Sequence, residues 1–249
     1  MIRYTVRLAD CVISVSAIFE STKRYCASYL TEGSPDFEIT IQPGDIAFER
    51  SKCAREDALE GRTIRRMTDT QLEITAVQRK IAEKLFTYDT ILLHGSVVAV
   101  DGAAYLFTAK SGTGKSTHTA LWCDLLGNRA VMVNDDKPFL RVTEDGILAY
   151  GSPWNGKHGR GSNICVPLKA ICILERGTQN QIRPIDAKEA LFTLLQQTNR
   201  PMDPVQMPKY LELIDRLTKQ MSFYRMACNM DPEAARMAYG AMSGQENGV

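Results

Sequence analysis

A glycine-rich segment in the middle of the chain carries the residue types that bind phosphate groups. Residues 109–117 read Ala-Lys-Ser-Gly-Thr-Gly-Lys-Ser-Thr, and they depart from the phosphate-loop (Walker A) pattern G-x-x-x-x-G-K-[ST] only at Ala109. Gly112 and Gly114 let backbone N–H groups converge on phosphate oxygens, because glycine adopts φ and ψ angles that other residues avoid. Lys115 adds a cation for the β- and γ-phosphates, and Ser116 adds a hydroxyl for Mg²⁺. We name residues 109–114 the glycine loop and predict that it binds the phosphates of a nucleotide.

Two adjacent carboxylates follow a short apolar stretch later in the chain. Residues 131–133 are Val-Met-Val, which predicts a buried strand ending in Asn134, Asp135 and Asp136. In proteins with a phosphate loop, a carboxylate at a strand end holds Mg²⁺, and a catalytic carboxylate takes the proton from an attacking hydroxyl. The two aspartates can divide these roles. The alternative is that they only form a turn or a helix cap.

A third segment, residues 151–161, is long and rich in glycine and polar residues, which is typical of a functional loop. Lys157 and Arg160 offer positive charge to a transferring phosphoryl group or to an acidic acceptor. Trp154 can stack on a base or help to close the loop over a substrate. The alternative is a solvated basic turn that Trp154 anchors.

The sequence also predicts the elements that must position these residues. Asp101-Gly102 joins two apolar runs, residues 91–100 and 103–108, and this dipeptide is a strong signal for a tight hairpin turn. The second strand of the hairpin runs into the glycine loop, and a helix over 115–126 follows and stops at Gly127. Further strands are expected beside the Asp145-Gly146 turn and at 169–175, 181–185 and 223–228, with helices at 187–199 (opened by a capping box of Asp186 and Glu189), at 205–220 and from 232 onward.

The N-terminal part has a different pattern. Up to about residue 74 the chain reads as short strands between turn signals such as Pro43-Gly44-Asp45. Ile74, Val77, Ile81 and Leu85 then recur at helical spacing and predict a linking helix that ends near Phe86. We therefore expect a β-rich N-terminal module over 1–74 and a second domain over 75–249.

Taken together, these motifs resemble the P-loop kinases related to HPr kinase/phosphorylase, which share a nucleotide-binding core with phosphoenolpyruvate carboxykinases. The resemblance runs from about Leu92 to Arg141 and follows one order: Leu93-His94-Gly95-Ser96, the Asp101-Gly102 hairpin, the glycine loop and then Asp135-Asp136. It implies an α/β fold of that type, with a mixed, twisted sheet and flanking helices after the β-rich module.

The resemblance also implies site roles and cofactors. ATP-Mg²⁺ would contact the glycine loop and the start of the next helix: Ser111, Gly112, Thr113, Gly114, Lys115, Ser116 and Thr117. Ser116 and Asp136 are the metal residues we name, and which of Asp135 and Asp136 is the general base stays open. His94 would lie near the γ-phosphate, although by sequence alone a histidine after Ile91–Leu93 is more typical of a structural residue.

These inferences favour an ATP-Mg²⁺-dependent kinase acting on a hydroxyl, such as a serine of a small protein or peptide, or a hydroxyl of a metabolite. A nucleotide-binding regulatory module without turnover is the alternative. A carboxykinase-type enzyme is disfavoured by the length of 249 residues. The related kinases form oligomers, so a homo-oligomer is an open expectation.

Composition excludes several other classes. The chain has 30 Lys+Arg against 29 Asp+Glu, and this balance argues against a nucleic-acid or polybasic membrane partner. Its apolar runs are strand-sized, and charges throughout the N-terminus argue against a secretory signal, so we expect a soluble cytoplasmic protein. The seven cysteines lack zinc-ligand spacing and are expected to be reduced thiols.

Overall fold

A continuous helix, α3 (Asp69–Leu85), carries the chain out of its N-terminal unit. The computed structural model describes residues 1–59, 61 and 63–244. It divides into two units, Met1–Lys84 and Leu85–Val249. A boundary after residue 74 would cut α3, because the buried side chains of Ala76, Val77 and Ile81 lie beyond that point on the same helix.

The N-terminal unit contains a small three-stranded sheet. Strands β1 (Ile2–Leu8) and β2 (Cys11–Ala17) form an antiparallel hairpin, and β3 (Phe37–Thr40) lies parallel to β2. Helices α1 (Glu20–Tyr25), α2 (Pro43–Leu59) and α3 belong to the same unit as this sheet. The expectation of short strands up to residue 74 is wrong over α2, because Pro43 opens a helix and Asp45 lies in its first turn.

One buried carboxylate, that of Glu73 on α3, joins the parts of this unit. It accepts hydrogen bonds from the backbone N–H of Ile18 at 2.5 Å and of Phe19 at 3.0 Å. It also accepts one from the hydroxyl of Thr22 at 2.5 Å. Because Glu73 has no exposed surface, these three donors replace the water that the charge would otherwise hold.

The second unit is built on one curled, mixed sheet. Nine strands form it within the described residues, and their order is β4-β8-β9-β10-β6-β5-β7, with β12 beside β10 and β11 beside β12. Their bounds are β4 (Thr90–Leu92), β5 (Gly95–Val100), β6 (Ala103–Thr108), β7 (Ala130–Asn134), β8 (Phe139–Val142), β9 (Ile147–Tyr150), β10 (Cys165–Arg176), β11 (Gln181–Ile185) and β12 (Ser222–Cys228).

Strand β10 explains the curl, because different parts of it pair with different neighbours. Residues 165–167 pair antiparallel with β9, whereas residues 168–173 pair parallel with β6 and residues 170–176 pair parallel with β12. The register shifts between Leu168 and Ala170, where the strand changes partners. Such irregularities bend a strand and increase its twist.

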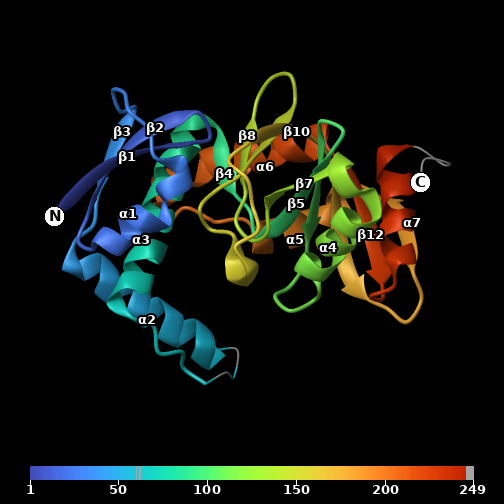
Figure 1. Cartoon of the computed structure of the whole chain (residues 1–249), viewed down its shortest axis with the longest axis horizontal. Helices are drawn as coiled ribbons and strands as arrows, with labels where there is room; N and C mark the ends of the chain where they lie inside the picture. Colours follow the sequence, from blue (N-terminus) through green and yellow to red (C-terminus); the bar gives the residue numbers. More distant parts are fainter. Residues whose placement is uncertain (60, 62, 245–249) are drawn as a thin grey trace. The chain divides into compact units, whose positions relative to one another are not determined.

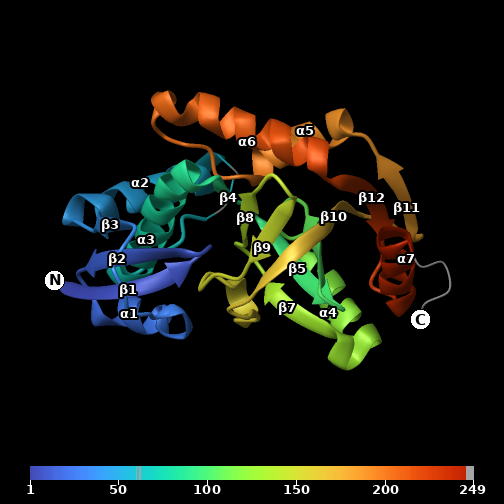
Figure 2. The same cartoon turned by 90° about the horizontal axis from the view of Figure 1, so that it is seen from above.

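Helices cover both faces of this sheet. Helices α4 (Lys115–Leu126) and α7 (Pro232–Ser243) contact each other and bury Trp122 and Tyr239. Helices α5 (Ala187–Gln197) and α6 (Met207–Gln220) supply Leu194, Leu213 and Leu217 to the other core. Figure 1 gives the order of these elements, and Figure 2 shows α5 and α6 on one side of the sheet and α4 on the other.

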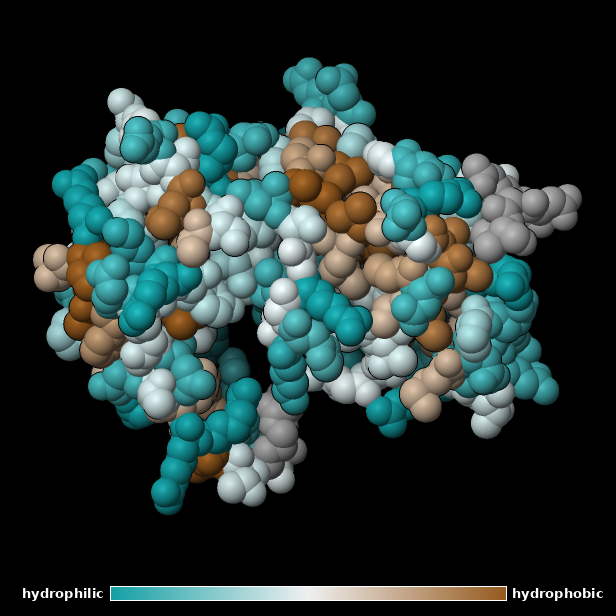
Figure 3. All heavy atoms as spheres, in the orientation of Figure 1, coloured by the Kyte–Doolittle hydropathy of each residue, from teal (hydrophilic) through white to brown (hydrophobic). Residues whose placement is uncertain are grey.

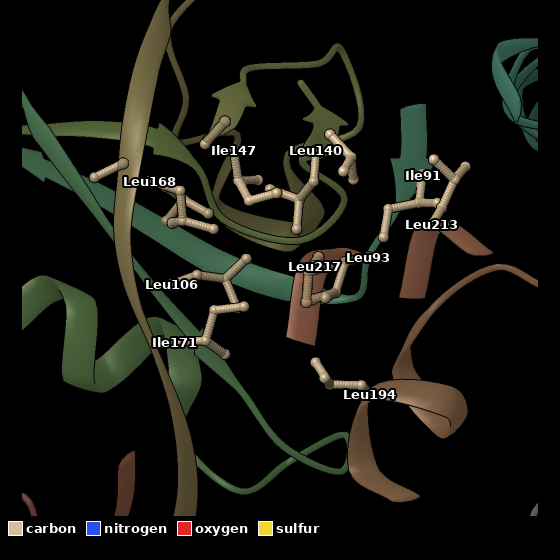
Figure 4. Packing of buried hydrophobic residues seen from close by; sticks show 14 of the residues in the cluster. Ile91, Leu93, Leu106, Leu140, Ile147, Leu168, Ile171, Leu194, Leu213 and Leu217 are labelled. Atoms are coloured by element: carbon tan, nitrogen blue, oxygen red, sulfur yellow. The ribbon is translucent and has the colours of Figure 1, made fainter. Parts of the chain in front are cut away.

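Alternating side chains in the central strands fill the two cores. On β6, Ala104 and Leu106 face the α5–α6 side, whereas Tyr105 and Phe107 face α4 and α7. This period of two is the expected pattern for a strand buried on both faces. Figure 4 shows the first core from close by, with Leu217 beside Leu93.

The surface and the helix lengths bear on membrane contact. On the face drawn in Figure 3, hydrophobic side chains lie in groups between hydrophilic ones. No helix in the described part of the chain has the length and apolar character needed to cross a membrane.

Candidate functional site

The predicted site residues meet at one edge of the large sheet. Strands β6, β7, β10 and β12 all run in the same direction, since β5 is antiparallel to both β6 and β7 and β10 is parallel to both β6 and β12. Their carboxyl ends therefore lie along one edge. Ligands in α/β sheets bind at this kind of edge.

The glycine loop follows β6 and leads directly into α4. Gly112 and Gly114 have φ angles of 79° and 121°, and a Cβ atom at either position would meet open space. Their role is therefore conformational, because other L-residues rarely adopt these angles. Ala109 is not among the described residues with positive φ, so its methyl group suits the first position of the motif.

Lys115 lies at the inner side of this loop. Its side chain is buried, and Nζ donates a hydrogen bond to the backbone oxygen of Ala109 at 3.0 Å. Burial lowers the pKa of Lys115, while the charges of Asp136 and Asp135 oppose that shift. The two carboxylates are thus close enough to the Lys115 ammonium group for their charges to affect its pKa.

A network centred on Asn134 holds the two aspartates. The Asn134 side-chain oxygen accepts from the backbone N–H of Asp136 at 2.8 Å and of Lys137 at 2.6 Å. Asp135 is buried, and its carboxylate accepts from the hydroxyl of Ser96 at 2.8 Å. Burial raises the pKa of Asp136, against the lowering effect of the nearby Lys137 and Lys115. Asn134 and Ser96 were not predicted as site residues from the sequence.

His94 lies just before β5 and contacts the second aspartate. Its Nε2 is 3.4 Å from Asp136 Oδ1, and its Nδ1 is 2.9 Å from the side-chain oxygen of Gln197. Burial, followed by the positive charges of Lys137 and Lys115, lowers the pKa of His94 to about 3. The imidazole is therefore neutral near pH 7, and its contact with Asp136 is not an ion pair.

The loop over 151–161 lies beside Asn134 and Asp136. Asn134 Nδ2 donates to Asn155 Oδ1 at 2.8 Å, and a Cβ atom on Gly156 would lie 3.2 Å from that of Asp136. Lys157 and Arg160 are exposed. Trp154 is 5% exposed and packs edge-on against Phe139. The ring therefore anchors the loop, and the expectation that it stacks on a base does not fit this position.

Arg176, at the end of β10, adds a contact to the glycine loop. Its guanidinium donates to the backbone oxygen of Gly112 at 2.5 Å. Ser111, Thr113, Ser116 and Thr117 all belong to the same turn and first helical residues, and each is at least partly accessible. Only the parallel pairing of β10 with β6 brings Arg176 here, and such a long-range pairing leaves no local signal in the sequence.

The carboxylate and hydroxyl groups at this site bear on metal binding. In the described residues, no group of three or more His, Cys, Asp or Glu side chains is arranged to hold a metal ion. Mg²⁺ does not require such a cage, since it commonly binds one or two carboxylates together with phosphate oxygens and water. Asp135, Asp136 and the hydroxyl of Ser116 are oxygen donors of this type.

The fold and site define a class: a mixed α/β unit with a glycine loop and paired carboxylates at one sheet edge. A family model described as "ScmC: SynChlorMet cassette protein ScmC" matches residues 63–232, more than half of the chain. The protein belongs to this family.

Other comparisons show only distant likeness. Among the solved structures, the Hpr(Ser) kinase/phosphatase from Coxiella burnetii is similar with a TM-score of 0.35 and 11% identity, over 61% of this chain and 99% of that chain. Among curated proteins, no relative matches.

Proposed function

We propose that this protein is an ATP- and Mg²⁺-dependent phosphotransferase with a P-loop core, acting on a hydroxyl group. One observation carries the proposal: the glycine loop, with positive φ at Gly112 and Gly114, leads into α4 beside a buried Lys115 and two carboxylates. Backbone N–H groups at a helix N-terminus favour phosphate. The lysine adds a positive charge that attracts phosphate, which the negative carboxylates cannot supply.

Each of these residues has its own role in phosphoryl transfer. Lys115 and the loop N–H groups hold the phosphates and stabilise the charge that develops on the transferred group. Ser116 and one aspartate would hold Mg²⁺, which supplies further charge neutralisation when it is bound. The other aspartate takes the proton of the attacking hydroxyl. Asn134 and Ser96 position the two carboxylates through the hydrogen bonds described above.

The acceptor approaches from the side of the loop over 151–161. Gly156 lies against Asp136, and Lys157 and Arg160 are exposed at the same segment. A serine side chain of a small protein or peptide, or a hydroxyl of a metabolite, suits this open and positively charged approach. His94 lies beside Asp136 as a neutral neighbour of the transferred group.

Three variants test the proposal. Lys115→Ala is expected to lose nucleotide binding, whereas Asp135→Asn and Asp136→Asn keep nucleotide but lose transfer by about 100-fold or more. Binding is measured by calorimetry with ATP and Mg²⁺, and transfer is measured with radiolabelled ATP and a lysate of the source cell as acceptor. Exposed Asp145→Asn is the matched control and keeps full transfer.

The same assay separates the two roles of the carboxylates. Raising the Mg²⁺ concentration restores transfer in the variant that lacks a metal ligand but not in the variant that lacks the base. Full transfer in all three variants would refute the mechanism. Binding of ATP without any turnover would favour a regulatory module instead.

A further inference from the structure

A cavity of about 270 Å³ lies beside the glycine loop, on the side of the sheet that α5 covers. Lys110 and Thr113 of the loop form one wall, and Arg176 at the end of β10 forms another. Gln197, the last residue of α5, lines the side toward His94. The volume is below the range of pockets that enclose a whole small-molecule ligand, about 300–1,000 Å³. The cavity therefore suits a group of side-chain size.

Positive charge dominates the polar lining of this cavity. Among the described residues that line it, the cations are Lys110, Arg176 and Arg225, and the carboxylate is that of Glu175. Arg225 pairs with Glu175, and it also pairs with Glu189 at 2.8 Å. Within the described chain, no carboxylate pairs with Lys110 or Arg176. These two side chains leave the cavity with an excess of positive charge, which favours an anion.

The glycine loop holds one of these two cations in place. Arg176 donates from Nη2 to the backbone oxygen of Gly112, and its other N–H donors remain available for a ligand. A guanidinium can bind a carboxylate through two parallel hydrogen bonds. Lys110 is exposed, so its ammonium group can turn toward the same anion. The two cations together therefore suit a carboxylate.

Gln197 connects the cavity with the reacting groups. Its side-chain oxygen lies 2.9 Å from His94 Nδ1, and His94 Nε2 lies 3.4 Å from Asp136 Oδ1. The amide of Gln197 and the imidazole of His94 therefore separate the cavity from the Asp136 carboxylate. An extended peptide advances about 3.3 Å per residue, so a residue about two or three positions from a serine at Asp136 reaches the cavity. In a free hydroxy acid such as L-serine, the hydroxyl and the carboxylate lie on neighbouring carbon atoms, which is too close to reach both places.

We propose that this cavity binds the carboxylate of an acidic residue in the acceptor, and that the acceptor is a peptide segment with this residue about two or three positions from the phosphorylated serine. Lys110 and Arg176 are then the residues that select the acceptor. This inference rests on the proposed function, because it requires phosphoryl transfer from ATP beside Asp135 and Asp136. The peptide passes the loop over 151–161, presents its serine to the aspartates and continues toward the cavity.

Acidic, neutral and basic serine peptides test the assignment. Pools with a central serine and flanking residues of one charge class are incubated with the full chain, radiolabelled ATP and Mg²⁺. Transfer converts serine to phosphoserine and releases ADP and the hydroxyl proton. The unmodified protein is expected to label the acidic pool at least about tenfold more efficiently than the basic pool, because hydrogen bonds between charged groups are the strong ones. Free L-serine represents a small acceptor and should be labelled poorly.

Variants at Lys110 show whether the cavity causes this preference. The measured quantity is the ratio of labelling between the acidic and basic pools, because a loss of nucleotide binding lowers both pools equally. Lys110→Glu is expected to reduce this ratio at least about tenfold, whereas Lys110→Arg keeps the charge and the ratio. Lys188→Glu is the matched control, since Lys188 is exposed near the other end of α5. Thermal unfolding shows that each variant is folded.

Several outcomes would overturn the assignment while the proposed function stands. They are equal labelling of the acidic and basic pools, an unchanged ratio in Lys110→Glu, and labelling of L-serine as efficient as that of the acidic pool. Labelling of a component of a cell lysate without labelling of any peptide pool would overturn it as well. Absence of ATP binding in calorimetry with Mg²⁺ would instead overturn the proposed function itself.

Discussion

Two histidines, the buried His118 and the partly buried His94, make the second unit sensitive to mild acid. Burial is the main cause that lowers the pKa of His94 to about 3 and of His118 to about 4, from an ordinary value of 6.5. As the pH falls, the unfolded chain therefore binds protons at these residues before the folded chain does. Their contribution to stability is complete above about pH 6.5 and is lost as the pH falls toward the folded pKa values.

The size of the effect follows from the shifts. At pH 5 the solution is about 1.5 units below the ordinary pKa of histidine, so protonation stabilises the unfolded chain by about 2 kcal/mol for each histidine. The two histidines together lower the free energy of unfolding by about 4 kcal/mol. This is a large fraction of the stability of a typical domain, about 5–15 kcal/mol. The loss between pH 7.5 and pH 5 should therefore be easy to measure.

Urea unfolding followed by tryptophan fluorescence isolates this unit, because the two tryptophans, Trp122 and Trp154, both belong to it. His94→Gln and His118→Gln should each reduce the pH-dependent loss by about 2 kcal/mol relative to the unmodified protein. His158→Gln is the matched control, since His158 is exposed and should leave the loss unchanged. If all three variants lose as much stability between pH 7.5 and pH 5 as the unmodified protein, the reasoning is refuted.

Three further predictions concern single side chains. Glu73→Ala should destabilise the N-terminal unit by about 3 kcal/mol, since three buried donors lose their acceptor, and urea unfolding followed by circular dichroism should show no such loss for exposed Glu20→Ala. Gly114→Ala should weaken ATP binding about tenfold, measured by calorimetry, because the φ of 121° at Gly114 disfavours a side chain. Gly44→Ala is the control and should bind ATP normally, since Gly44 has no positive φ. Equal binding by the two variants would contradict the prediction. Trp154→Ala should destabilise the second unit by about 3–5 kcal/mol, and an unchanged thermal midpoint would show that the ring does not anchor its loop.

Local signals in the sequence predicted much of the second unit. Asp101 and Gly102 have φ angles of 50° and 82°, as a type I′ turn requires, and β5 and β6 pair as the expected hairpin. Asp186 is confirmed as the N-cap of helix α5, because the backbone N–H of Glu189 donates to Asp186 Oδ1 at 2.8 Å. The Glu189 carboxylate, which the predicted capping box would direct to the Asp186 N–H, pairs with Arg183 and Arg225 instead. The hairpin and the N-cap depend on neighbouring residues, and so a sequence pattern reveals them.

Other features depend on distant partners or on competing signals. Pro43-Gly44-Asp45 is read as a turn, yet the same residues begin helix α2, since proline suits both positions. The contact of Arg176 with the glycine loop follows from strand pairing that no short window contains. The hydrogen bonds of Asn134 to the next two backbone N–H groups after Asp135 are local, and a turn argument at the strand end could have found them. The hydrogen bond from Trp122 Nε1 to His118 Nε2 was within reach of a sequence argument, because residues four apart share one face of a helix.

The pairing of β10 has a consequence for how the chain is made. Its second half borders β12, which begins at Ser222, about fifty residues later in the sequence. During synthesis from the N-terminus, β6 and the first half of β10 can therefore associate while the outer edge of β10 still has open hydrogen-bonding groups. An unpaired strand edge of this kind invites pairing with other chains. We expect chains truncated before Ser222 to aggregate, even though they retain the entire glycine loop.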